Sequence, residues 1–167
     1  MNTQITTIDP LLPIFREYLE YMSQFFEITH YDSWCEGALK NLHRYPMKEN
    51  HHAYILTESG AIVGFALVNQ HLRFNPHGFA VAEFYIQKDH EKKGYGRKLA
   101  EHVFEKFKGN WEVAVSLKNR SALMFWEQVV SSYTEGLFLK KKIASFNGYG
   151  FVFNCYNRWV CSPTSFR

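Results

Sequence analysis

The residues best suited to chemistry lie in one segment, residues 82–100, which reads Ala-Glu-Phe-Tyr-Ile-Gln-Lys-Asp-His-Glu-Lys-Lys-Gly-Tyr-Gly-Arg-Lys-Leu-Ala. An apolar, aromatic run over residues 79–86 predicts a strand at the start of this segment. A polar turn follows, in which Gly94 and Gly96 flank a tyrosine, and a helical pattern begins at Leu99. A strand, a glycine turn and a helix in this order outline an anion-binding site.

The chemistry of such a turn follows from its backbone. The first N–H groups of a helix have no intrahelical acceptor and lie at the positive end of the helix dipole, so together they attract a phosphate. Gly94 and Gly96 have no Cβ, which lets the backbone take a positive φ and approach a ligand closely. Positive side chains surround the same turn, namely Lys92, Lys93, Arg97 and Lys98. We therefore predict that the turn binds a phosphate-bearing ligand.

Two other phosphate loops do not fit this segment. A Walker loop requires Gly-Lys-Ser/Thr after four spacer residues, whereas Gly96 is followed by Arg-Lys-Leu. A dinucleotide-binding fingerprint requires a third glycine at the position that Leu99 occupies. The segment therefore indicates neither a P-loop nucleoside triphosphatase nor a dinucleotide-binding domain.

The turn instead resembles the pyrophosphate loop of the GNAT superfamily of acyl-CoA-dependent N-acetyltransferases, which reads Gln/Arg-x-x-Gly-x-Gly/Ala. Residues 91–96, Glu-Lys-Lys-Gly-Tyr-Gly, match it in spacing and glycines and depart from it at Glu91. A second segment, residues 119–127, reads Asn-Arg-Ser-Ala-Leu-Met-Phe-Trp-Glu and is similar to the family's Asn-x-x-Ala-x-x-Phe-Tyr-Glu. The resemblance spans about residues 55–130 and keeps the order strand, loop, helix, strand, helix.

This resemblance implies that acetyl-CoA is the acyl donor and that a primary amine of a small molecule, peptide or protein accepts the acetyl group by direct transfer. It also implies that the backbone N–H of Ile86 meets the developing oxyanion. The strand ending there would part from its neighbour around Trp111 to Leu117, through a β-bulge, and open a slot for the pantetheine arm. The cofactor-binding residues that it implies are Phe84, Tyr85, Ile86, Lys92, Lys93, Gly94, Tyr95, Gly96, Arg97, Lys98, Asn119 and Trp126.

Acetyl transfer needs a base, because an alkylamine with a pKa of roughly 10 is protonated at neutral pH. Glu83 is the predicted base, since it lies on the strand where several members of the family place a catalytic glutamate. A surface glutamate paired with a nearby lysine is the competing interpretation. Asn119 suits two roles that compete for one oxygen, a hydrogen bond to pantetheine and the N-cap of a helix.

The leaving thiolate has no obvious proton donor in this sequence. Many members of the family have a tyrosine at the position of Trp126, and an indole N–H has no proton to give at useful pH. Tyr133 is the nearest candidate for a general acid. Two alternatives stay open: the thiolate leaves without an acid, or transfer is slow or absent.

Composition limits the class of protein. With 167 residues, of which 46% are apolar, the chain is expected to be one domain over residues 1–167. The net charge of +3 is slight and disfavours a nucleic-acid partner. Three cysteines predict no disulfide framework, and eight dispersed histidines predict no metal site. No apolar run approaches ~18 residues, so no membrane partner and a cytoplasmic location are expected.

The periodicities predict an α/β domain with a mostly antiparallel mixed sheet of about six to seven strands and about four helices. The helices are expected from Asp9-Pro10 through an apolar stripe to Phe25, over 33–42, from the glycine turn to Gly109, and over 119–130. The strands are expected over 3–8, 51–57, 61–70, 79–86, 111–117, 133–140 and 149–160, the last two joined through 140–142 and 147–148. Residues on the opening helices, Tyr18, Tyr21 and Trp34, are interpreted as core packing rather than as an acceptor site.

Two further hypotheses remain beside the enzyme. A catalytically silent module that binds acyl-CoA is compatible with Glu91 and Trp126. A nucleotide- or nucleic-acid-binding domain could use the basic turn, although the missing loop signatures and the slight charge disfavour it. The aromatic C-terminal strand is suited to pairing at a homodimer interface.

Overall fold

A computed structural model describes residues 1–156 as a seven-stranded sheet flanked by helices on both faces. The strand order is β1-β2-β3-β4-β5-β7-β6, and every neighbouring pair is antiparallel except β4 with β5. The strands are β1 Asn2–Ile5, β2 His52–Glu58, β3 Ala61–Asn69, β4 Phe79–Ile86, β5 Asn110–Ser116, β6 Phe138–Ile143 and β7 Gly148–Asn154. The α-helices are α1 Leu12–Ser23, α2 Tyr31–His43, α3 Tyr95–Lys106 and α4 Arg120–Thr134. This confirms the predicted mixed, mostly antiparallel sheet.

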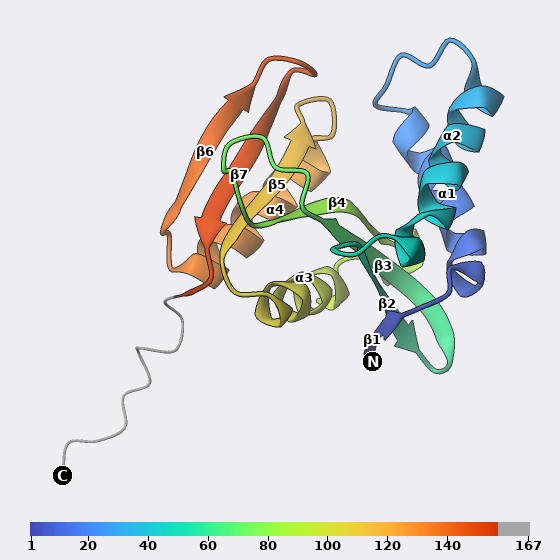
Figure 1. The fold of residues 1–167 in the computed structure, drawn as a ribbon, viewed down its shortest axis with the longest axis horizontal. Helices are drawn as coiled ribbons and strands as arrows, with labels where there is room; N and C mark the ends of the chain where they lie inside the picture. Colours follow the sequence, from blue (N-terminus) through green and yellow to red (C-terminus); the bar gives the residue numbers. More distant parts are fainter. Residues whose placement is uncertain (157–167) are drawn as a thin grey trace.

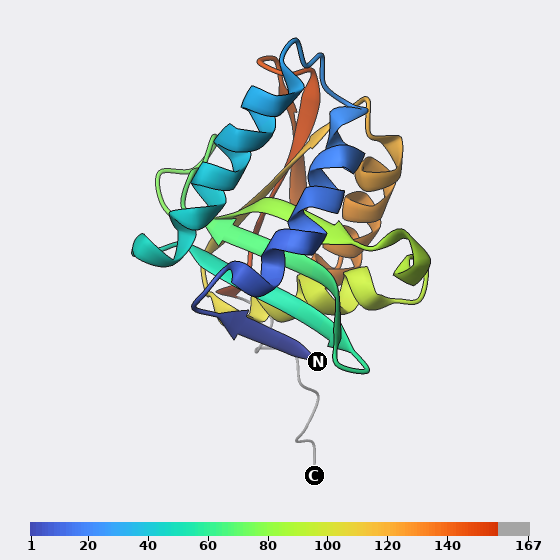
Figure 2. The same cartoon turned by 90° about the vertical axis from the view of Figure 1, so that its right-hand side faces the viewer.

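Two apolar cores lie on the two faces of the sheet. The helices α1 and α2 pack over one face and α3 and α4 over the other, as the two views show (Figures 1 and 2). Phe65 and Leu67 of β3 face the first core, whereas Ala66 and Val68 face the second, because side chains alternate along a strand. Within residues 1–156, no helix is long and apolar enough to cross a bilayer.

The central hairpin forms where its turn residues predict. Ser59 and Gly60 take φ values of 50° and 84°, and this left-handed pair allows β2 to reverse directly into β3. The next strand, β4, spans residues 79–86 as predicted. Because β4 ends immediately before the polar turn, the turn lies at the end of β4 that no longer pairs with β5.

The helix boundaries correct two predictions. Asp9 does not cap the first helix, because residues 9–11 form a 3-10 turn and α1 begins at Leu12 with Pro13 in its first turn. The strand predicted over 133–140 is present but begins later, because α4 continues to Thr134 and β6 spans Phe138–Ile143. Residues 140–142 therefore lie within β6 rather than in a connection.

The same two regions show why the boundaries differ. The last turns of α4 bury Val130 and Tyr133 in the core, which keeps the chain helical. The helix ends only where Glu135 and Gly136 take left-handed conformations and the Gly136 N–H donates to Ser131 O at 2.8 Å. The predicted last strand extends to residue 160, and its part after residue 156 lies outside the described residues.

The pairing of β4 with β5 is short and opens the sheet. The two strands pair in parallel only at three positions, from Phe79 with Trp111 to Val81 with Val113. Between β3 and β4 the register shifts after Leu67, so that Ala82 is the extra residue of a β-bulge. Beyond the bulge, β4 and β5 diverge, and β5, β7 and β6 rise away from β4 (Figure 1). The predicted parting and bulge are both present.

Candidate active site

A cleft of about 780 Å³ occupies the gap between the diverging strands. Its walls come from β4, β5, the glycine turn and the first turns of α4, with α1 closing one end. Gln87 N–H donates to Val63 O at 2.9 Å, and successive residues alternate along an antiparallel ladder, so the N–H groups of Phe84 and Ile86 point away from β3. These two donors therefore face the cleft.

The glycine turn has the geometry of an anion site. Gly94 is the N-cap of α3 with φ +83°, and no side chain caps this end of the helix. The first intrahelical bond is from Lys98 N–H to Gly94 O at 3.1 Å, which leaves the preceding N–H groups without an acceptor in the helix. Lys92 also takes a positive φ of 58°. Backbone donors and lysine charge thus meet at the edge of the cleft.

Most of the predicted cofactor-binding residues line this cleft. Those on its surface are Phe84, Tyr85, Ile86, Lys92, Gly94, Gly96, Arg97, Asn119 and Trp126. Three others, Lys93, Tyr95 and Lys98, are not on its surface. Glu91, the departure from the family's loop, does line the cleft beside Lys92.

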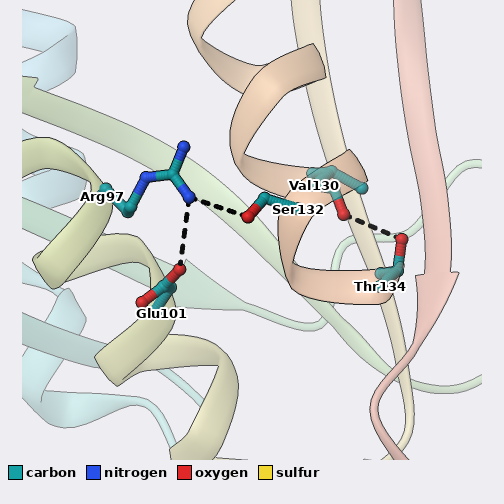
Figure 3. A network of polar contacts seen from close by, with 5 residues as sticks. All are labelled: Arg97, Glu101, Val130, Ser132 and Thr134. Atoms are coloured by element: carbon teal, nitrogen blue, oxygen red, sulfur yellow. Dashed lines mark hydrogen bonds and ion pairs between the residues drawn. The ribbon is translucent and has the colours of Figure 1, made fainter. Parts of the chain in front are cut away.

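The guanidinium of Arg97 is engaged by other protein groups. It donates to the Ser132 hydroxyl of α4 at 2.8 Å and lies 3.9 Å from the Glu101 carboxylate on its own helix (Figure 3). In the same view, the Thr134 hydroxyl donates to Val130 O at the end of α4. Arg97 thus joins α3 to α4, a role that its position after the glycines did not reveal.

Glu83 lies on the floor of the cleft, on the face of β4 that points toward α1. Its carboxylate accepts a hydrogen bond from the Tyr18 hydroxyl. Burial raises the pKa of Glu83 to about 7, and the hydrogen bond from Tyr18 opposes this rise. Burial, and then the charge of Glu83, hold the pKa of Tyr18 well above its usual value. The pair therefore consists of a carboxylate that titrates near neutrality and a phenol that stays protonated.

A second cavity, of about 650 Å³, adjoins the cleft between α1, α2 and β3. Both cavities have Tyr18, Ala82 and Glu83 in their walls. The bulge at Ala82 and the carboxylate of Glu83 thus lie at the junction of the two cavities. A group bound in the cleft and a second group bound under α2 would meet at this carboxylate.

The aromatic residues of the opening helices are more than core packing. Tyr18 lines both cavities, Tyr21 lines the cleft, and Trp34 lines the second cavity. The interpretation as core alone is corrected, because α1 and α2 cover one face of the sheet (Figure 2) and their aromatic side chains also form cavity walls. The helical spacing of Tyr18 and Tyr21 shows that they share one face but cannot show what that face covers.

Asn119 serves as the N-cap of α4. Its Oδ1 accepts from the Ala122 N–H at 3.0 Å, and its Nδ2 lies 3.3 Å from the hydroxyl of Tyr21. Only 6% of the residue is exposed. Asn119 therefore caps α4, as predicted. Contact between its side-chain amide and a ligand stays a prediction.

The two aromatic residues considered for the leaving group differ in position. Trp126 lines the cleft and packs edge-on against Phe84, with ring centroids 4.8 Å apart. Tyr133 lies two helical turns further along α4, with 3% exposed, and packs against Phe104. It does not line either cavity, so the structure does not bring this predicted acid to the other site residues.

The fold is an open sheet split between β4 and β5, with a cleft in the gap and a glycine turn of free backbone donors at its edge. The model of the acetyltransferase (GNAT) family matches residues 13–130 of the chain. The protein therefore belongs to the GNAT acetyltransferase family. A search of the curated proteins finds no match to this sequence.

Solved structures share the fold at low sequence identity. An acetyltransferase from Thermus thermophilus has a TM-score of 0.66 and 17% identity, covering 93% of this chain and 97% of that one. The PaiA N-acetyltransferase from Thermoplasma acidophilum, in complex with coenzyme A, has a TM-score of 0.65 and 13% identity, covering 93% and 99%. A candidate streptothricin acetyltransferase from Bacillus anthracis, in complex with acetyl coenzyme A, has a TM-score of 0.53 and 15% identity. In that comparison the match covers 67% of this chain and 66% of that one.

Proposed function

We propose that this protein transfers the acetyl group of acetyl-CoA directly to a primary amine of a small molecule, peptide or protein. The observation that carries the proposal is the position of Glu83, whose carboxylate lies where the cleft meets the second cavity. With a pKa of about 7, this carboxylate is half ionised at neutral pH and can accept a proton from an amine. The bound coenzyme A and acetyl coenzyme A of the two neighbouring structures support the choice of donor.

The remaining residues have separate tasks in the proposed reaction. The backbone N–H groups at the start of α3, with Lys92, would hold the pyrophosphate. The N–H groups of Phe84 and Ile86 would pair with amide or thioester oxygens of the donor. Glu83 would take the proton as the amine nitrogen bonds to the acetyl carbon and the carbon–sulfur bond breaks. The thiolate would leave beside Trp126, whose indole has no acidic proton to supply.

The test is calorimetric titration with acetyl-CoA, followed on the same sample by a free-thiol assay across a panel of amines. We expect saturable binding and thiol release with at least one amine. Absence of acetyl-CoA binding would refute the proposal. Binding without thiol release across a broad panel would favour the silent module, the alternative that Glu91 and Trp126 keep open.

A further inference from the structure

The second cavity has one acidic end and one basic end. Among the residues that line it, Glu83 is the single carboxylate, and Lys48 and His71 are the basic side chains. Glu83 lies opposite Leu67 in the sheet, and Asn69 is two residues further along β3, about 7 Å away. His71 follows two residues after Asn69, in the loop after β3, and also lines the cavity. The carboxylate and the basic side chains thus come from different segments of the chain.

The basic end is a cluster of side chains. Lys48 and His71 line the cavity, and the rings of His71 and His51 are 5.4 Å apart. Burial, and then the charges of Lys48 and His71, lower the pKa of His51. The Tyr45 ring packs edge-on against His51, with centroids 4.7 Å apart. A ligand at this end would meet the positive charge of Lys48.

The wall between the two ends is mostly aromatic and apolar. It consists of Phe15, Leu19, Phe26, Trp34, Ala38, Leu42 and Leu67, from both opening helices and β3. The few polar groups here include Asn69, whose amide donates to the Tyr45 hydroxyl at 3.3 Å. Such a wall excludes water from the body of a ligand and favours an aromatic or aliphatic group. A flexible polycation would find one carboxylate in this cavity and would be repelled by Lys48.

We propose that the acceptor is a small amphipathic amine that carries an anionic group: the amine at Glu83, the apolar body between α1 and α2, and the anion at Lys48 and His71. This inference rests on the proposed function, because it names the substrate class of the same site. By its charge, such an acceptor differs from a polyamine, which carries several positive groups and no anion. A carboxylate and a phosphate would serve equally as the anion, since lysine pairs with either.

Three probes of one shape test the charge requirement. They are 4-(2-aminoethyl)benzoate, its neutral benzamide, and the diamine in which an aminomethyl group replaces the carboxylate. Calorimetry at pH 8, where Glu83 is ionised, would measure their binding with and without coenzyme A. We expect the benzoate to bind about threefold to tenfold more tightly than the benzamide, as partly exposed ion pairs do, and the diamine to bind most weakly.

A charge reversal locates the anion. Lys48→Glu should abolish the preference for the benzoate and improve the binding of the diamine. Lys142→Glu makes the same change in net charge on β6, at the opposite edge of the sheet and outside both cavities, and should leave the order of the probes unchanged. Equal binding of the three probes, or no binding of any at millimolar concentration, would overturn the inference. So would a preference that survives Lys48→Glu.

A thiol-release assay on the same samples separates this inference from the proposed function. Preferential binding of the benzoate without thiol release would keep the acceptor assignment and contradict the enzyme. Thiol release from all three amines at equal efficiency would keep the enzyme and contradict the assignment. A phosphonate version of the probe would show whether a phosphate-like anion can replace the carboxylate.

Discussion

At the scale of single residues, Glu83 is the group on which the proposed chemistry depends, and its titration also bears on stability. The rate of acetyl transfer should rise with pH through a midpoint near 7, because only the ionised carboxylate can accept a proton. Glu83→Gln should lower the rate at neutral pH and leave the affinity for acetyl-CoA unchanged. The measurement is kcat/KM against pH. A variant profile that superimposes on that of the wild type would show that Glu83 is not the base.

The same carboxylate predicts an unusual pH dependence of stability. A folded-state pKa of about 7, above the ordinary value of 4.5, means that the folded protein binds the proton more tightly than the unfolded chain. The contribution of Glu83 is therefore fully present below pH 4.5 and is lost as the pH rises through 7. At pH 8, Glu83→Gln should be more stable than the wild type by about 1–2 kcal/mol, after allowance for partial exposure. Urea unfolding at pH 5 and pH 8 would show whether this difference grows with pH.

Gly94 offers a residue-scale test of the anion site with a matched control. Gly94 has φ +83° and Gly60 has φ +84°, and an added Cβ meets nothing within 4 Å at either position. Alanine should therefore strain both backbones equally, by about 1 kcal/mol. Gly94→Ala should weaken acetyl-CoA binding at least about tenfold, whereas Gly60→Ala should not alter it. Equal affinities by calorimetry would argue against the glycine turn as the phosphate site.

At the scale of elements, β5 anchors the loop that follows β3. The carboxylate of Glu112 is 4% exposed and accepts from the N–H groups of Arg73, Phe74 and Asn75 at 2.7, 3.0 and 2.8 Å. A glutamine side chain at this position would place an NH2 group, itself a donor, against these backbone N–H donors. Glu112→Gln should therefore cost about 1–3 kcal/mol of unfolding free energy. Thermal unfolding would measure this loss, and Glu36→Gln, an exposed substitution on α2, should leave the midpoint unchanged.

Elements are also where sequence reasoning succeeded and failed. The strand over 79–86 and the glycine turn were predictable, because apolar runs and glycines act locally. The end of α4 was not, because burial of Tyr133 against Phe104 kept residues of high β-propensity helical. The contact of Tyr18 with Glu83 joins residues 65 positions apart, so no local pattern encodes it. The cleft was therefore foreseeable and its junction with the second cavity was not.

At the scale of the whole molecule, two cavities that meet at one carboxylate imply a complex of three components. The donor and the acceptor amine should both be bound before transfer, so initial-velocity plots should intersect rather than run parallel. The described cysteines, Cys35 and Cys155, line neither cavity. Intact-mass spectra after incubation with acetyl-CoA alone should show no acetyl-enzyme. An acetylated protein that passes its acetyl group to the amine would contradict direct transfer.

Because β4 and β5 pair at only three positions, the sheet of the free protein lacks part of the hydrogen-bond ladder between these two strands. Phe84 and Ile86 point their N–H groups into the gap, and β5 does not pair with them there. A donor whose pantetheine carries peptide-like groups would supply the missing partners and act as a replacement strand. Amide hydrogen exchange at these two residues should then be fast in the free protein and slow in the complex. The co-substrate would thus complete the architecture of the enzyme that consumes it.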